Sequence, residues 1–136
     1  MPKTRRRSRS SSTAAIAKKD IVAFFLELLT TIKMYHWNTY DYPAHKATDE
    51  LYSKLSDHID RFMEVYMGAT NQRIDLGNRR SIPLSSLSKS SMNAYIQKSI
   101  LFLDNIRLPA TSTDLYNIRD EMLGDLNQFL YLFSFK

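Results

Sequence analysis

Apolar residues recur along most of this chain at the three- and four-residue spacing of amphipathic helices. The pattern predicts four helices, over about 14–39, 43–71 and 89–106, and from about 115 to 133. In the first of them, His36 continues the apolar stripe one turn beyond Ile32. We find no convincing strand and no internal repeat. The predicted core positions of the first, third and fourth helices are Ile21, Phe25, Leu28, Leu29, Ile32, Met92, Ile96, Ser99, Leu103, Ile106, Leu115, Ile118, Met122, Leu126, Phe129 and Phe133.

Prolines and polar residues mark the ends of the helices. Pro43 suits a first helical position, because its missing amide hydrogen would be unpaired there in any case. Pro109 ends the third helix, and the segment from Thr111 to Asp114 resembles a capping box.

A long polar connection separates the second helix from the third. Residues 72–88 contain glycine, proline, asparagine and many serines, and they are numerous enough to cross the molecule from end to end. Four amphipathic helices with one long crossover predict an all-α fold, a ferritin-like four-helix bundle.

The charge is unevenly distributed along the chain. Residues 1–19 hold seven of the 19 basic residues and no acid, so 12 basic and 14 acidic residues follow, a net charge of about −2. We expect residues 1–13 to be a disordered basic tail and residues 14–136 to form the bundle. Lys3, Arg5, Arg6, Arg7 and Arg9 are candidates for non-specific contact with nucleic-acid phosphates. A nuclear localisation signal and a solubilising tail are the alternatives.

Composition excludes several classes of protein. The chain has no cysteine, which removes disulfides, thiolate metal sites and iron–sulfur clusters. No apolar run approaches the roughly 20 residues that span a bilayer, and the basic start does not lead into a signal peptide. We expect an intracellular protein, with the nucleoid, the nucleus or a virion as candidate locations.

Four potential metal ligands share one face of the second helix. With His45 as the origin, Asp49, Asp60 and Glu64 lie at roughly 40°, 60° and 100° around the helix axis. Together with His36 they suit iron, zinc or manganese. The bland alternative is a solvent-exposed acidic stripe without metal. His58 lies roughly 140° from Asp60 and is interpreted as a surface residue.

The four side chains do not share a height along the helix. Asp49 and Asp60 are 11 residues apart, or roughly 16 Å at 1.5 Å per residue, so one centre cannot include both within one chain. A two-fold dimer with antiparallel second helices would place His36, His45 and Asp49 opposite Asp60 and Glu64 of the mate. Such a dimer would hold two identical sites.

The sequence His36-Trp37-Asn38, followed by His45-x3-Asp49-x10-Asp60-x3-Glu64, resembles the Dps proteins, the DNA-protecting miniferritins. The resemblance implies that His36, His45 and Asp49 of one subunit and Asp60 and Glu64 of its mate are the catalytic metal ligands, with Trp37 beside them. It implies a hollow homo-oligomer, typically a dodecamer, that protects against oxidative stress. Such an assembly oxidises ferrous iron with peroxide or oxygen, stores the ferric product and binds DNA.

Two other functions remain open. One is a non-enzymatic nucleic-acid-binding or packaging protein built on the same bundle. The other is a zinc or manganese site that only stabilises the dimer.

Overall fold

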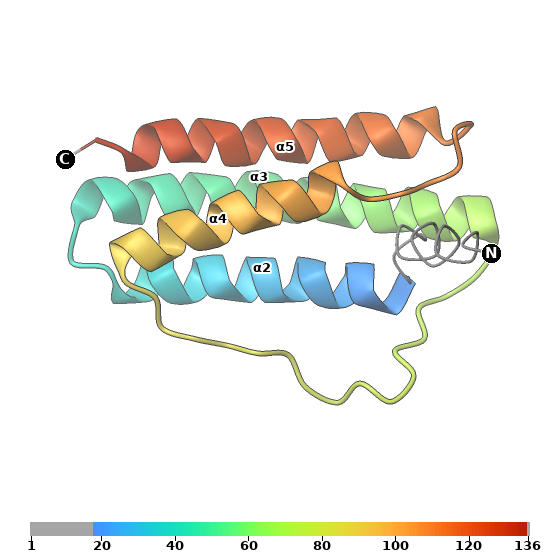
Figure 1. Cartoon of the computed structure of the whole chain (residues 1–136), viewed down its shortest axis with the longest axis horizontal. Helices are drawn as coiled ribbons and strands as arrows, with labels where there is room; N and C mark the ends of the chain where they lie inside the picture. Colours follow the sequence, from blue (N-terminus) through green and yellow to red (C-terminus); the bar gives the residue numbers. More distant parts are fainter. Residues whose placement is uncertain (1–17, 136) are drawn as a thin grey trace, which may run out of the picture.

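The computed structural model describes residues 18–135, with side chains from residue 20 onward, and this part of the chain contains four helices and no strand. The helices, labelled as in Figure 1, are α2 (Lys18–Asn38), α3 (Tyr42–Thr70), α4 (Lys89–Asp104) and α5 (Thr113–Phe133). The all-helical prediction is therefore confirmed. The predicted helical residues 14–17 and the predicted tail 1–13 lie outside the described range. None of the described helices is long and apolar enough to cross a membrane.

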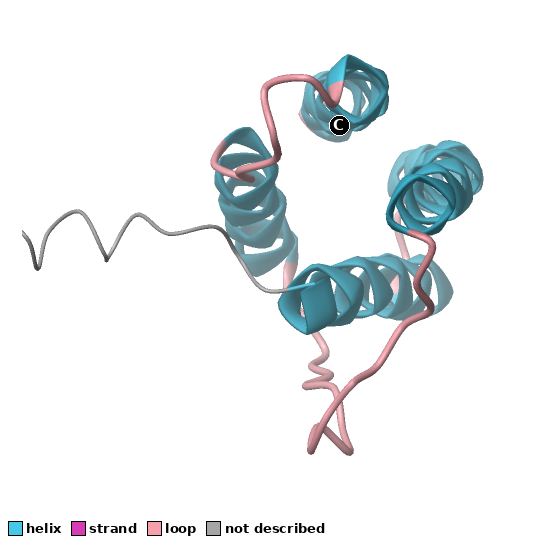
Figure 2. Cartoon of the chain, turned by 90° about the vertical axis from the view of Figure 1, so that its right-hand side faces the viewer, coloured by secondary structure: helices cyan, strands magenta, loops and turns pink. Residues whose placement is uncertain are grey.

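The helices form a bundle in which each one has two neighbours. Helix α3 packs against α2 on one side and α5 on the other, and α4 packs against α5. Helix α4 also contacts α2, where the rings of Phe24 and Phe102 stack with their centroids 4.0 Å apart. Neighbouring helices run in opposite directions, whereas α3 and α4 run in the same direction (Figures 1 and 2).

The connection between α3 and α4 follows the outside of the bundle. Residues 71–88, here called the connecting segment, lie outside α2 between the end of α3 and the start of α4 (Figures 1 and 2). The side chains of Arg79 and Asp20 attach it to α2 through an ion pair of 3.1 Å.

The core consists of the faces that the apolar spacing predicts. Every predicted position of the third and fourth helices is buried, including Ile106, which lies just beyond the end of α4. In α2 the predicted residues are buried apart from Leu29, which is only partly covered. At the centre Phe25 and Phe62 meet edge to face, with ring centroids 5.4 Å apart. Removal of this apolar surface from water is the main force that holds the four helices together.

Local sequence explains how α3 begins and ends. Asp41 is extended at the N-cap, and Pro43 lies in the first turn as predicted. At the other end Asn71 adopts the left-handed conformation, with φ of 56°, and its N–H donates to the carbonyl of Met67. Asparagine tolerates this conformation better than most residues, so the helix stops there.

The predicted capping box before α5 is wrong. Ser112 occupies the N-cap and makes no side-chain hydrogen bond, while the Asp114 carboxylate accepts from the N–H of Leu115. In contrast, α4 has a side-chain cap, because the Ser88 hydroxyl accepts from the N–H of Ser91 at 3.2 Å. The predicted box failed because its pattern allows a helix start at either Thr111 or the following serine.

Candidate metal centre

His36 and His45 form a stacked pair where α2 turns into α3. His36 lies in the last turn of α2 and His45 in the first turn of α3, and both are half-buried. Their ring centroids are 3.9 Å apart and the ring planes differ by 19°. The short turn after Asn38 brings the two rings together although nine positions separate them in sequence.

Each histidine is oriented by the backbone of the other. Nδ1 of His36 lies 3.0 Å from the carbonyl oxygen of His45, and Nδ1 of His45 lies 3.0 Å from the carbonyl oxygen of His36. A carbonyl oxygen can only accept, so Nδ1 carries the hydrogen in both rings. The lone pair of each neutral ring is then on Nε2, the atom that a metal ion would bind.

Thr48 supports this pair from inside the bundle. Its side chain is fully buried, and its hydroxyl donates to the carbonyl of Ala44 at 2.8 Å. The same oxygen lies 3.2 Å from Nδ1 of His36, which can therefore share its hydrogen between Thr48 and the backbone of His45. A hydrogen-bonded outer group of this kind typically holds a ligating histidine in place.

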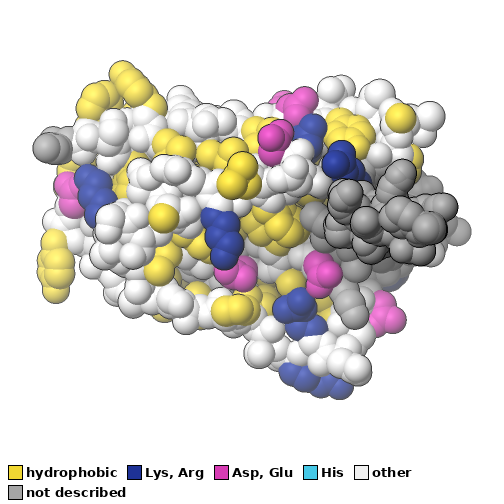
Figure 3. Space-filling view, in the orientation of Figure 1, with side chains coloured by type: hydrophobic (Ala, Val, Ile, Leu, Met, Phe, Trp, Pro, Cys, Tyr) yellow, Lys and Arg dark blue, Asp and Glu magenta, His cyan; other side chains and the backbone are white. Residues whose placement is uncertain are grey.

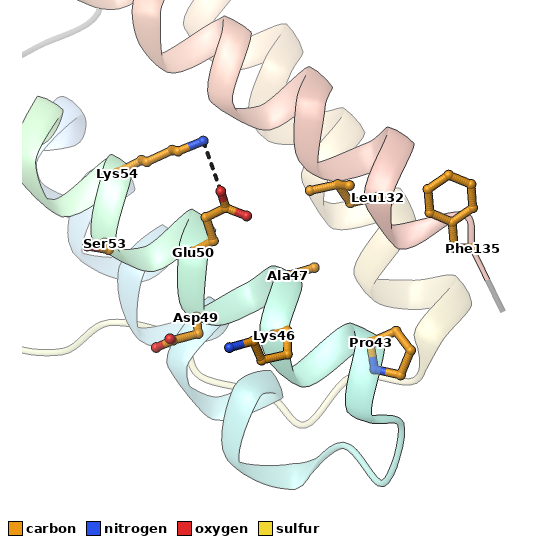
Figure 4. Close-up of a pocket in the computed structure, with 9 residues that line it drawn as sticks. All are labelled: Pro43, Lys46, Ala47, Asp49, Glu50, Ser53, Lys54, Leu132 and Phe135. Carbon is orange, nitrogen blue, oxygen red and sulfur yellow. Dashed lines mark ion pairs between the residues drawn. The ribbon is translucent and has the colours of Figure 1, made fainter.

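Asp49 lies one turn beyond His45, beside a cavity of about 590 Å³ between α3 and the C-terminal end of α5. Figure 4 shows that its carboxylate points away from Leu132 and Phe135, which form the apolar wall. Asp49 is exposed and has no hydrogen bond or ion pair with a described residue. Its neighbour Glu50 instead pairs with Lys54 at 3.4 Å.

Asp60 and Glu64 are exposed further along the same helix. Neither carboxylate has a hydrogen bond or ion pair within the part of the chain that the structure describes. The helical rise puts Asp60 roughly 16 Å from Asp49 along the axis. Among the described residues, no group of three or more His, Asp or Glu side chains could hold a metal ion. Within one chain, His36 and His45 therefore lie together, whereas Asp60 and Glu64 lie further along α3 and away from them.

The remaining predicted site residues are Trp37 and the five basic residues of the tail. Trp37 follows His36 but is 69% exposed. The five basic residues of the predicted tail lie outside the described range.

His58 is not the surface residue that the helical projection indicated. Its Nδ1 lies 2.5 Å from Oδ2 of Asp125, and its Nε2 lies 3.8 Å from Oε1 of Glu121. Both acids belong to α5, so this imidazole links α3 to α5. The interpretation was wrong because a projection of α3 on its own does not show which faces α5 covers.

Two tyrosines have altered acidity. Burial raises the pKa of Tyr35, which packs edge to face on Phe133. Burial also raises the pKa of Tyr95 to about 12, and its hydroxyl donates to Oε2 of Glu27 at 3.3 Å. Both phenols therefore stay neutral at physiological pH.

Thr48 and the exchanged backbone contacts were not predicted from sequence. A threonine on the buried face of a helix carries no signal of its own, because its role depends on two residues at the end of another helix. The spacing of His36 and His45 about a predicted turn was the available signal, and it indicated only that they could be close.

Comparison with known proteins identifies the family. No curated protein and no solved structure matches the chain. Residues 36–133 match the model of a family described as "Family of unknown function (DUF5856)", and this match begins at His36 and includes Asp49, Asp60 and Glu64. Because the match spans well over half of the chain, the protein belongs to the DUF5856 family.

Proposed function

We propose that this protein is a Dps-like ferroxidase, which oxidises ferrous iron at a site shared between two subunits and binds DNA non-specifically through its basic N-terminal tail. The fold proposed with it is the ferritin-like bundle with a long crossover. The proposed assembly is built from two-fold dimers, up to a closed dodecameric cage.

The histidine pair is the observation that carries the proposal. Two neighbouring imidazoles, each with Nδ1 hydrogen-bonded to a backbone carbonyl, have their Nε2 lone pairs free for a cation. The structure gives Nε2 of neither ring a hydrogen-bond partner among the described residues. Imidazole nitrogens suit iron or another divalent metal such as zinc or manganese. Because no three potential ligands of the described chain are grouped closely enough to hold a metal ion, the remaining ligands would have to be brought together by assembly.

Asp60 and Glu64 would complete the site from the second subunit. Two exposed carboxylates one turn apart, without a described cationic partner, suit a role in an interface. In a two-fold dimer with antiparallel α3 helices, the same pair of surfaces meets twice. Each site would then contain two imidazoles and three carboxylates.

The ferrous ion is the substrate of the proposed reaction. Two ferrous ions each give one electron to one hydrogen peroxide molecule, which takes up two protons and becomes two water molecules. The carboxylates of Asp49, Asp60 and Glu64 would offset the cationic charge, and the imidazoles would set the position of the ion.

Anaerobic titration with ferrous iron, followed by peroxide or oxygen, tests the proposal. We expect a rise in ferric absorbance with the wild type and a large loss of its rate with the Asp60→Ala, Glu64→Ala double variant. A matched control, Asp104→Ala with Glu121→Ala, removes the same charge from α4 and α5 and should keep the wild-type rate. Equal rates in both double variants would contradict the shared site.

A second candidate is a nucleic-acid-binding or packaging protein without iron oxidation. The observation that favours it is the same exchange of hydrogen bonds, since two stacked histidines also tie α2 to α3 in a protein without metal. Salt-sensitive DNA binding by a wild-type protein that gives no ferric absorbance would support this candidate. Chelation that dissociates an oligomer, again without oxidation, would instead indicate a structural zinc or manganese site.

A further inference from the structure

Basic residues are concentrated in the connecting segment, in α4 and in the turn that follows it. Residues 71–112 contain six basic and two acidic residues. By contrast, the ranges 41–70 and 113–135, which include α3 and α5, contain ten acidic and four basic residues. The six basic residues of 71–112 are all exposed, and they are Arg73, Arg79, Arg80, Lys89, Lys98 and Arg107.

One turn of the connecting segment presents several hydrogen-bond donors in a small space. An open hollow of about 350 Å³ is lined by Leu76, Asn78, Arg79, Arg80 and Ser81. Two guanidinium groups, one amide and one hydroxyl can all donate, and no carboxylate lines the hollow. Donors of this kind are the groups that bind phosphate oxygens.

Few contacts hold the two arginines of this turn. Gly77 has a φ of 61°, a left-handed conformation that glycine adopts without strain. The Arg80 guanidinium contacts the carbonyl of Gly77 at 3.4 Å, near the limit of a hydrogen bond. Arg79 pairs with Asp20 at 3.1 Å, but both side chains are more than a third exposed, so the pair is weak. Both guanidinium groups can therefore turn towards an anion.

Figure 3 shows where this surface lies. Dark blue side chains mark the lower edge of the molecule, where the connecting segment runs outside α2, and further ones lie over α4. Most residues of the connecting segment are exposed, and the segment runs along the outside of the bundle.

We infer that the turn 76–81 is a second nucleic-acid contact, which binds backbone phosphates through Arg79 and Arg80. This inference rests on the nucleic-acid part of the proposed function, and it assigns a contact to the folded domain in addition to the tail. Counterion release at about 0.1 M salt is worth roughly eightfold in affinity for each phosphate contact. Loss of both arginines should therefore weaken binding by between tenfold and a hundredfold.

Nucleic acid is favoured over other partners because the hollow is lined mainly by polar donors and the chain already carries an acid-free basic start. The rival partner is an anionic membrane, because Ile74 and Leu84 of the same segment are 40% and 53% exposed. A second rival is the acidic surface of another copy of the chain.

Fluorescence anisotropy tests the inference. Binding of the full chain to a labelled duplex of about 20 base pairs is measured at several salt concentrations. The turn variant is the double variant Arg79→Gln, Arg80→Gln. Its control is the double variant Lys46→Gln, Arg61→Gln, which removes equal charge from α3. A third variant replaces Arg5, Arg6, Arg7 and Arg9 by glutamine. The magnitude of the slope of log affinity against log salt should fall by about 2 for the turn variant and stay nearly unchanged for the control.

The outcomes separate the inference from the proposed function. If the salt dependence of affinity is that of the wild type in the turn variant but is weaker in the variant that lacks Arg5, Arg6, Arg7 and Arg9, the second contact is overturned and the tail remains as the DNA-binding element. Equal losses in the turn variant and the α3 control also overturn it, because they indicate an effect of net charge. Absence of duplex binding by the wild type overturns the nucleic-acid function itself. Binding to anionic vesicles, or salt-sensitive self-association that the turn variant abolishes, without duplex binding, assigns the surface to a rival.

Discussion

Alanine substitution of His36 and His45, singly and together, measures how the stacked pair contributes to stability. In the His36→Ala variant the protein loses one hydrogen bond to the carbonyl of His45, worth about 1 kcal/mol, and the contact between the rings. Stacked aromatic pairs contribute about 0.5–1.5 kcal/mol. Each single variant should therefore lose about 2 kcal/mol of unfolding free energy.

The double variant distinguishes the two contributions. Each hydrogen bond ends on a backbone carbonyl, which alanine at the other position leaves in place. Only the ring contact depends on both side chains. The double variant should therefore lose about 3 kcal/mol rather than about 4, which corresponds to a coupling energy of about 1 kcal/mol.

Urea denaturation, followed by far-ultraviolet circular dichroism, provides the four free energies of the cycle. Protein concentration must be constant, because any oligomer would make the apparent stability depend on it. Additivity within about 0.3 kcal/mol would refute the stacked arrangement. A coupling near 2 kcal/mol, equal to the whole loss of one single variant, would instead refute the backbone contacts, because it would require bonds from one ring to the other.

Three further predictions concern the bundle. Phe62→Ala should cost about 3–5 kcal/mol in urea denaturation, because Phe62 is fully buried, whereas Leu101→Ala, at an exposed position, should cost less than about 0.5 kcal/mol; similar losses would contradict the described core. Asp125→Ala should cost about 1–2 kcal/mol by removing the partner of half-buried His58, and an equal loss from Asp125→Ala in a His58→Ala background would argue against their contact. Tyr95 has a pKa of about 12 in the folded protein and an ordinary pKa near 10, so the free energy of unfolding should fall as the pH rises from 10 towards 12. Tyr95 is partly exposed, so Tyr95→Phe should reduce this alkaline loss of stability by about 1–2 kcal/mol, and a variant with the same alkaline profile as the wild type would refute the prediction.

The positions of the helices followed from local patterns. Helical spacing identified the buried faces of α4 and α5, because an amphipathic helix shows its core side in its own sequence. Pro43 and Asn71 marked the ends of α3 through backbone preferences that operate within a few residues. The capping prediction at Thr111 failed at the same scale, since two nearby residues compete for one helix start.

The candidate site was only partly predictable. The pattern of ligand types singled out His36 and His45, and the rise per residue of an α-helix was enough to separate Asp49 from Asp60. The stacking of the rings, the exchange of hydrogen bonds with opposite backbones and the support from Thr48 were not visible in that pattern. These contacts depend on how closely two helix ends approach each other.

The sequence by itself determined that this chain forms amphipathic helices and which faces they bury, because spacing and backbone preference are properties of neighbouring residues. Tertiary structure decided which polar side chains meet. It turned His58 towards two acids of α5 and oriented both histidines of the turn by opposite carbonyls. It also left Asp60 and Glu64 without described partners. Such pairings depend on the packing of separate helices, which no periodicity within one helix records.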